Sequence, residues 1–289
     1  MKNGMKVLVT GSSGYIGRHV VGELLKRGHS VIASDMALDA YYVGDTRVTQ
    51  TQENIFSGAP DIYERLGRPD VLIHLAWEAG FVHNSPVHMQ KLSNHVRFLM
   101  DMINGGLTDL AIMGSMHEVG FYEGAVTADT PCKPLSLYGV AKNALRQSMI
   151  IESGSKNFRL YWLRAYYIYG DDQRGSSIFA KITQAASEGK KTFPFTTGQS
   201  KYDFIHIDEL AHQIVASATQ DREKPDQLIT GVINVCSGKS ISLAEQVETF
   251  IRENGYDIKL EYGVFPDRPY DSKEIWGDDG LIREILAKE

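Results

Sequence analysis

Three glycines at intervals of three residues restrict the fold of this chain more than any other feature. Gly11, Gly14 and Gly17 follow the apolar run KVLVTG at 6–11 and open the amphipathic run IGRHVVGELLKRG at 16–28. A strand, a glycine turn and a helix in that order let the backbone approach a pyrophosphate, which the N–H groups of the helix N-terminus bind. The sequence therefore predicts a dinucleotide site whose loop residues are Gly11, Ser13, Gly14, Tyr15, Ile16 and Gly17.

Asp35 ends the next apolar run, SVIASD at 30–35. This is the place expected for an acid that hydrogen-bonds the adenosine ribose hydroxyls. A carboxylate there repels a 2′-phosphate, so the sequence favours NAD(H) as cofactor and leaves NADP(H) open. The structural alternative is an aspartate that merely caps the turn at the end of the strand.

Apolar runs of strand length alternate with amphipathic runs over the first 170 residues. Continuous apolar strands separated by helices predict a parallel sheet that is buried on both faces. We therefore expect an α/β fold, with a doubly wound Rossmann domain over 1–170. After that the pattern is irregular, so 171–289 is expected to form mainly a smaller C-terminal substrate-binding lobe, with a segment around 203–236 returning to the first domain.

Composition excludes several classes of protein. The net charge is −6 and no basic run occurs, which argues against nucleic acid as a partner. No apolar run approaches the roughly 20 residues that cross a bilayer, and the N-terminus lacks the apolar core of a signal peptide. Cys132 and Cys236 lie outside any metal-binding spacing, so no metal is expected. Two lone thiols suit a cytoplasmic protein.

A tyrosine and a lysine carry the chemistry that the sequence suggests. Tyr138 and Lys142 stand four residues apart in SLYGVAKNALR and share one face of a helix. An ammonium beside a phenol favours phenolate and lowers the phenol pKa, which prepares a tyrosine for proton transfer near neutrality. Ser115, in MGSMHEVG, stands at the end of an apolar strand, where its hydroxyl can orient a carbonyl oxygen toward Tyr138. The alternatives are a surface helix pair and an ordinary loop serine.

With these motifs in this order, the sequence resembles the extended short-chain dehydrogenase/reductases that act on nucleotide sugars. The resemblance covers nearly the whole chain and rests on VTGSSGYIG, VLIHLAW, GSMHEVG, PLSLYGVAK, LRAYYIYG and YDFIHIDELA. It implies catalytic roles for Ser115, Tyr138 and Lys142. Open α/β sheets bind their ligands at the C-terminal ends of the strands, so Leu75, Ala76 and Trp77, at the end of the HLAW strand, are expected to contact the cofactor beside Tyr138 and Lys142.

Within that family, HLAW, GSMHEVG and YGVAKNALR look most like the bacterial 4-reductases of nucleotide-linked 4-keto-6-deoxy sugars. The resemblance implies NAD(P)H-dependent reduction at C4, of the kind that forms dTDP-fucose, dTDP-6-deoxytalose or CDP-abequose for surface polysaccharides. Two alternatives stay open: an NAD-dependent 4-epimerase, and a non-catalytic dinucleotide sensor that binds a protein partner. Pairing of helices into a homodimer is common in the family.

Six residues are expected on the substrate side, each with a structural alternative: Trp77, His117, Glu118, Tyr167, Lys201 and Arg268. Trp77 is expected to border the nicotinamide, or else to pack in the protein interior. His117 and Glu118 are expected to contact the sugar, or else to lie solvated at the surface. Arg268, in PDRPYD, resembles the family arginine that clamps a diphosphate, a task suited to bidentate guanidinium bonding. The sequence departs from the family pattern at His95, Val119 and Tyr167. These departures weaken the assignment of any particular family substrate to this chain.

Overall fold

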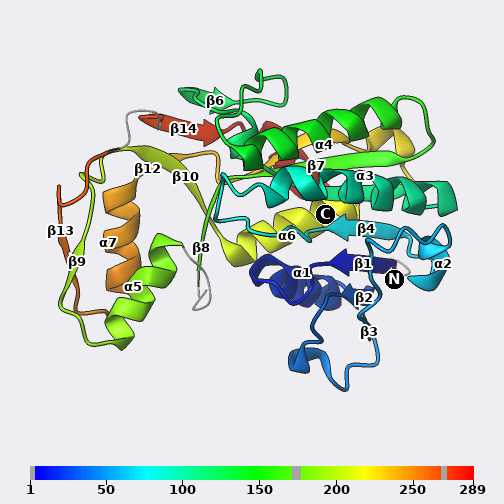
Figure 1. Ribbon diagram of the computed structural model, residues 1–289, viewed down its shortest axis with the longest axis horizontal. Helices are drawn as coiled ribbons and strands as arrows, with labels where there is room; N and C mark the ends of the chain where they lie inside the picture. The colour runs from blue at the N-terminus through cyan, green and yellow to red at the C-terminus, as the bar shows by residue number, and fades with distance from the viewer. Residues whose placement is uncertain (1–3, 171–176, 268–271) are drawn as a thin grey trace.

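The computed structural model describes residues 4–170, 177–267 and 272–289 (Figure 1). Its larger sheet has seven parallel strands in the order β11-β7-β5-β4-β1-β2-β3. The order reverses between β1 and β4, which creates the crevice where open α/β sheets bind ligands. The strands are β1 (Lys6–Thr10), β2 (Ser30–Ser34), β3 (Val48–Thr51), β4 (Val71–His74), β5 (Asp109–Ser115), β7 (Arg159–Ala165) and β11 (Gly231–Val235).

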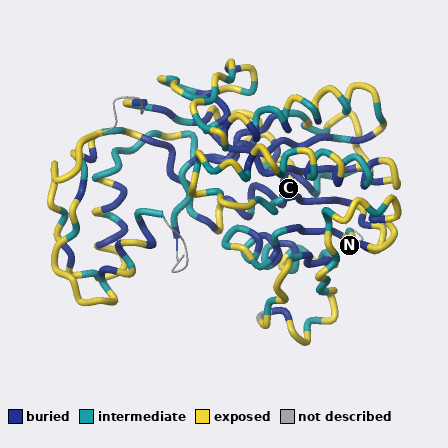
Figure 2. Tube along the Cα trace, in the orientation of Figure 1, coloured by how far each residue is buried: buried dark blue, intermediate teal, exposed yellow. Residues whose placement is uncertain are grey.

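Helices cover both faces of this sheet, which confirms the predicted doubly wound α/β fold. One face carries α1 (Tyr15–Lys26), α6 (Ile207–Ala218) and α8 (Gly280–Leu286). The other carries α2 (Ile62–Arg65), α3 (Val87–Gly105) and α4 (Leu137–Ser153). Alternate strand residues enter opposite cores: Val7 and Val9 enter the first, and Leu8 enters the second. This two-sided burial explains why the strands read as continuous apolar runs, and Figure 2 shows them buried.

A smaller lobe lies beside the larger sheet (Figure 1). Its main sheet has the order β12-β10-β14-β6, with β8 paired to β10, and β13 pairs with β9 at its outer side. The elements are β6 (Gly124–Val126), β8 (Tyr167–Tyr169), α5 (Ile178–Ser187), β9 (Thr192–Pro194), β10 (Lys201–His206), β12 (Ser240–Ser242), α7 (Leu243–Glu253), β13 (Lys259–Glu261) and β14 (Glu274–Gly277). A separate apolar core, which includes Phe179, Phe204 and Phe250, holds this lobe together.

The chain passes between the two parts several times. After β10, α6 and β11 rejoin the larger sheet, and α8 packs on α6. Conversely, β6 leaves the first part to pair with β14 in the smaller lobe. The domain boundary at residue 170 and the returning segment around 203–236 stay predictions. Within the described ranges, no helix combines the length and the apolar character that a membrane crossing requires.

Candidate active site

The glycine loop packs too closely for side chains at two of its glycines. Gly11 has φ of +72°, and a Cβ there would meet the Ala76 amide nitrogen at 2.8 Å. A Cβ on Gly17 would collide with the Gly11 carbonyl oxygen. Gly14 stands at the N-cap of α1, where no side chain caps the helix and no acidic residue occupies the first turn. The loop therefore presents helix N–H groups and the positive end of the helix dipole, which fit a pyrophosphate.

Asp35 joins this loop to the end of β2. Its Oδ2 accepts a hydrogen bond from the Ser13 amide at 3.0 Å, and its Oδ1 accepts one from the Met36 amide at 2.7 Å. A carboxylate has about four acceptor positions, so these bonds leave capacity for ribose hydroxyls. The side chain is half-buried. These residues fit the adenosine half of a dinucleotide, and their assignment as its ligands stays a prediction.

The structure brings the three predicted catalytic residues together. Ser115 is the last residue of β5, and Tyr138 and Lys142 lie in the first two turns of α4. Ser136 starts that helix, because its Oγ accepts a hydrogen bond from the Gly139 amide at 3.1 Å. The Ser115 hydroxyl lies near enough to the Tyr138 side chain to lower its pKa, and Lys142 Nζ lies 6.0 Å from the Tyr138 ring centroid. A carbonyl oxygen beside both hydroxyls would accept hydrogen bonds from each of them.

The charges of this triad differ from the expectation. Burial raises the pKa of Tyr138 to about 12, the nearby Ser115 hydroxyl opposes that rise, and Lys142 does not contribute to the shift. The close contacts of Nζ are with other groups, since it donates to the Met113 carbonyl oxygen at 2.9 Å and lies 3.8 Å from the Trp77 ring centroid, against 6.0 Å from that of Tyr138. Burial lowers the pKa of Lys142 to about 7. The expected lowering of the Tyr138 pKa by Lys142 is therefore absent from the free chain.

Glu118 lies behind the serine, in the short helix η2 (Met116–Glu118), and has no exposed surface. Its Oε1 accepts the Ser115 amide at 2.6 Å, and its Oε2 accepts Trp162 Nε1 at 3.0 Å. The Nε atoms of Arg146 and Arg164 each lie 3.6 Å from Oε2. Burial raises the pKa of Glu118, and the two guanidiniums oppose that rise. This placement gives Glu118 no surface for a substrate, so we assign it to holding the Ser115 loop.

Trp77 and three histidines form a wall beside Lys142, an arrangement that no sequence pattern indicated. Trp77 Nε1 donates to His88 Nδ1 at 3.1 Å, and the indole stacks on His95 with 4.4 Å between ring centroids. His95 Nδ1 hydrogen-bonds His74 Nε2 at 2.9 Å. Burial lowers the pKa of His95 to about 3 and that of His74 well below its usual range, so both rings are neutral.

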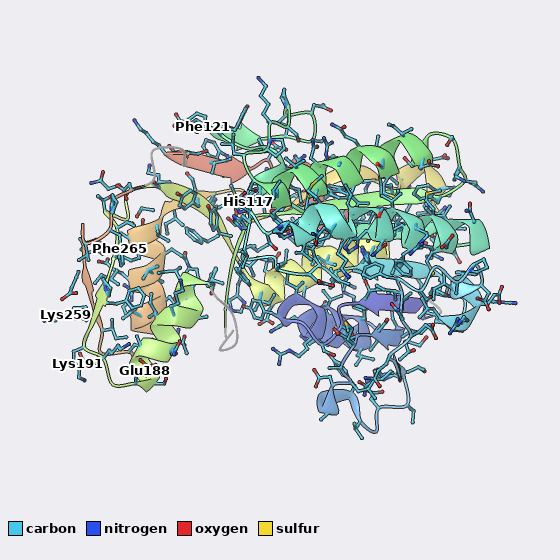
Figure 3. The ribbon with its side chains drawn as sticks, viewed as in Figure 1. His117, Phe121, Glu188, Lys191, Lys259 and Phe265 are labelled. Carbon is cyan, nitrogen blue, oxygen red and sulfur yellow. The ribbon has the colours of Figure 1, made fainter. Side chains whose placement is uncertain are left out.

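Two further histidines lie against Tyr138. The ring of His83, in the loop between β4 and α3, stacks on Tyr138 with 5.4 Å between centroids, and the His83 carbonyl accepts the Tyr138 amide at 2.8 Å. The His117 ring lies 4.3 Å from that of His83. Burial lowers the pKa of His117 to about 4. Figure 3 places His117 at the end of α4 that faces the smaller lobe. The sequence predicted His117 as a substrate contact. No spacing pattern marked His83.

The other predicted residues lie at several places. Leu75 is half-buried against the core, and the Ala76 amide lies 3.5 Å from Thr10 Oγ1. Tyr167 packs on Tyr202 in the smaller lobe, with 4.5 Å between centroids. Lys201 lies exposed at the start of β10, 3.7 Å from Glu274. Arg268 lies outside the described residues.

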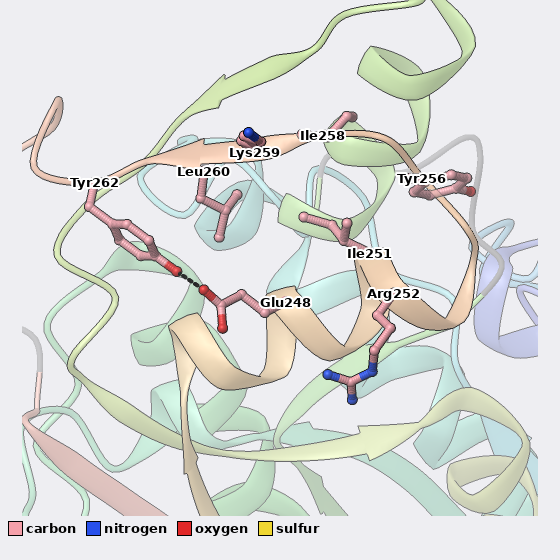
Figure 4. Close-up of a pocket in the computed structure, with 8 residues that line it drawn as sticks. All are labelled: Glu248, Ile251, Arg252, Tyr256, Ile258, Lys259, Leu260 and Tyr262. Atoms are coloured by element: carbon pink, nitrogen blue, oxygen red, sulfur yellow. Dashed lines mark hydrogen bonds between the residues drawn. The ribbon is translucent and has the colours of Figure 1, made fainter.

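A groove of about 460 Å³ in the smaller lobe lies between α7 and β13 (Figure 4). Glu248 and Tyr262 hydrogen-bond across it, and Arg252 and Lys259 also line it. None of its lining residues belongs to the cluster around Tyr138. The candidate active site therefore rests on the convergence of Ser115, Tyr138 and Lys142 and not on the volume of a groove.

Residues 7–236 match the model of a family described as the NAD dependent epimerase/dehydratase family. A dTDP-6-deoxy-L-talose 4-dehydrogenase (NAD(+)) from Aggregatibacter actinomycetemcomitans is 40% identical to this chain, and the alignment covers 94% of the chain and 99% of that relative.

Solved structures of two epimerases share the fold. A UDP-N-acetylglucosamine 4-epimerase from Methanobrevibacter ruminantium, in complex with UDP-N-acetylmuramic acid, superposes with a TM-score of 0.83 at 21% identity, over 98% of this chain and 92% of that one. A UDP-glucose 4-epimerase from Thermus thermophilus, in complex with NAD, gives a TM-score of 0.82 at 19% identity, over 99% and 94%.

Proposed function

Because the chain belongs to the NAD dependent epimerase/dehydratase family, as its motifs indicated, we propose that it reduces the C4 ketone of a nucleotide-linked 4-keto-6-deoxyhexose with NADH. The observation that carries this proposal is the convergence of Ser115, at the end of β5, with Tyr138 and Lys142, in the first two turns of α4. The 40%-identical relative is named as a dehydrogenase at C4. Oxidation of a C4 hydroxyl and reduction of a C4 ketone are one reaction in opposite directions, so that relative supports the proposal.

The side chains divide the work at the carbonyl. The cofactor, when bound, supplies the hydride that C4 receives. Ser115 Oγ donates a hydrogen bond to the C4 oxygen and fixes its position, which stabilises the negative charge that develops there. Tyr138 gives its phenol proton to the same oxygen. Lys142, as an ammonium, favours the resulting phenolate and reaches the ribose next to the nicotinamide.

The finer substrate assignment extends this proposal. Asp35 favours NADH because its free acceptor positions suit ribose hydroxyls and its charge repels a 2′-phosphate. The relative favours dTDP as the nucleotide. We further propose that the sugar contacts Trp77 and His117 and that the diphosphate contacts Lys201, at the start of β10. Arg268 lies outside the described residues, and its role as a diphosphate clamp stays a prediction from the sequence.

The second candidate is a 4-epimerase, which would oxidise and re-reduce the same carbon with NAD held throughout. The two superposed 4-epimerases favour it, although at 19% and 21% identity they show the shared fold alone. The balance of cofactor separates the two reactions, because an epimerase consumes no reduced nicotinamide.

The test is to incubate the purified chain with dTDP-, CDP-, GDP- or UDP-linked 4-keto-6-deoxyhexose and NADH or NADPH, and to follow nicotinamide absorbance and products. The proposal expects one NADH consumed per sugar reduced, with dTDP preferred, and NADH formed when dTDP-6-deoxytalose and NAD⁺ are supplied. Interconversion of C4 epimers without net change of cofactor would replace the reductase with the epimerase.

A further inference from the structure

Lys142 is a buried cation whose position is unusual. Its side chain is 3% exposed. Within the part of the chain that the structure describes, no carboxylate lies within ion-pair distance of Nζ. Its close polar partner is the Met113 carbonyl oxygen at 2.9 Å, and the face of the Trp77 indole lies 3.8 Å away. A buried ammonium needs compensation, and an aromatic face is one of the few neutral groups that supply it.

Trp77 is fixed from three sides. Its Nε1 donates to His88 Nδ1, and because a carbonyl only accepts, His88 Nε2–H donates to the Val82 carbonyl oxygen at 3.0 Å. The indole also stacks on His95, at 20° between ring planes. His95 is in turn held by His74. The indole therefore cannot turn away from Lys142 without breaking hydrogen bonds in the buried wall.

The charged groups around Lys142 leave the indole as its main close partner. Glu118, in η2, raises the pKa of Lys142, but Arg146 in α4 and Arg164 in β7 also surround that carboxylate. The ionisable rings of β4 and α3 that face Lys142 are neutral because burial depresses their pKa, and Tyr138 is a protonated phenol. Those ionisable rings are His74 and His95, and His117 lies beyond Tyr138.

We propose that Trp77 is a positioning residue whose indole face holds the Lys142 ammonium near Tyr138. The indole takes the role that a carboxylate partner would have for a buried ammonium. The placement of the ammonium is a property of the free chain. Its catalytic consequence rests on the proposed reductase function, because there the ammonium stabilises the Tyr138 phenolate. Loss of the indole face lowers the pKa of Lys142, and the fraction of enzyme with a charged lysine falls at alkaline pH.

The first experiment needs no substrate. Tryptophan emission of the free chain is titrated with pH, and the contribution of Trp77 is obtained by subtracting the spectrum of Trp77→Phe. A transition with a midpoint near pH 7 is expected, because the pKa of Lys142 is lowered to about 7. It should vanish in Lys142→Met, which keeps the shape and removes the charge. A transition that persists in Lys142→Met reports His88 and overturns the proposal, as does its absence from the parent chain.

The second experiment measures the pH dependence of kcat/KM for C4 reduction. In Trp77→Leu, the alkaline limb should shift to lower pH by about one unit. Loss of a desolvated cation–π interaction lowers the pKa of the lysine by about that amount. Trp77→Phe, which keeps an aromatic face, should move it less, and Trp276→Phe, on β14 of the smaller lobe, should leave it in place. An unmoved limb in Trp77→Leu overturns the proposal. If the parent chain reduces no keto sugar, the proposed function fails while the emission titration still tests the role of Trp77.

Discussion

Replacement of Glu118 by glutamine removes the charge of a fully buried carboxylate and almost none of its volume. The Glu118 carboxylate receives hydrogen bonds from the Ser115 amide and Trp162 Nε1, and the guanidiniums of Arg146 and Arg164 lie 3.6 Å from it. An amide oxygen still accepts from Ser115. The amide NH₂, however, points a donor at guanidiniums, and the buried Arg164 loses its counter-charge.

The expected magnitude follows from this geometry. Removing one partner of a buried ion pair costs about 3–5 kcal/mol, and Glu118→Gln should lie near the lower end because one acceptor survives. Glu118→Ala should approach the upper end, since the Ser115 and Trp162 N–H groups also lose their acceptor. At about 2 °C per kcal/mol for a chain of this size, the melting temperatures should fall by about 6 °C and about 10 °C.

Urea unfolding and thermal melting of the two variants measure these losses. The matched control is Glu64→Gln, which breaks a solvent-exposed pair with Arg68 four residues along the chain and should leave the melting temperature unchanged. The alanine variant should also lose turnover, since Glu118 holds the amide of Ser115. If Glu118→Gln has the same melting temperature as the parent chain, the carboxylate is not a charged member of the cluster, and our assignment of its role is wrong.

Three further substitutions test separate parts of the site. Tyr138→Phe removes the proton donor and should lower kcat by about 10²–10⁴-fold, while calorimetry finds NADH affinity unchanged; turnover near that of the parent chain would exclude Tyr138 as the donor. Gly17→Ala places a Cβ against the Gly11 carbonyl and should abolish measurable NADH binding, whereas Gly22→Ala, on the same helix with open space around it, should bind normally. Asp35→Ser should narrow the ratio of kcat/KM for NADH over NADPH, and an unchanged ratio would show that Asp35 does not contact the ribose.

The features that the sequence predicted correctly depend on residues that lie close together in the sequence, within one strand, turn or helix. The glycine loop, the Tyr138–Lys142 spacing and the two-sided apolar strands are all local patterns, and each lies where it was expected. Element boundaries are less evident in the sequence, since the continuous run at 159–170 forms two strands, β7 and β8.

The features that the sequence did not predict depend on contacts between distant residues. Glu118 was expected to contact the sugar, with solvation as the alternative, but it is buried and hydrogen-bonded by Trp162, 44 residues further along the chain. The direction of the Lys142 ammonium depends on Trp77, 65 positions earlier, and on the histidines behind that indole. Burial of this kind comes from how helices pack on the sheet, and no spacing within α3 or α4 encodes it.

Isotope transfer tests whether this site reduces a sugar ketone at C4. The purified chain is supplied with a dTDP-linked 4-keto-6-deoxyhexose and NADH deuterated at both positions of nicotinamide C4, and the product is examined by NMR. We expect one deuterium per product molecule, bonded to C4 of the sugar, and no detectable product from Tyr138→Phe over the same reaction time. A product that carries no deuterium, or carries it at another carbon, would contradict the proposed reaction.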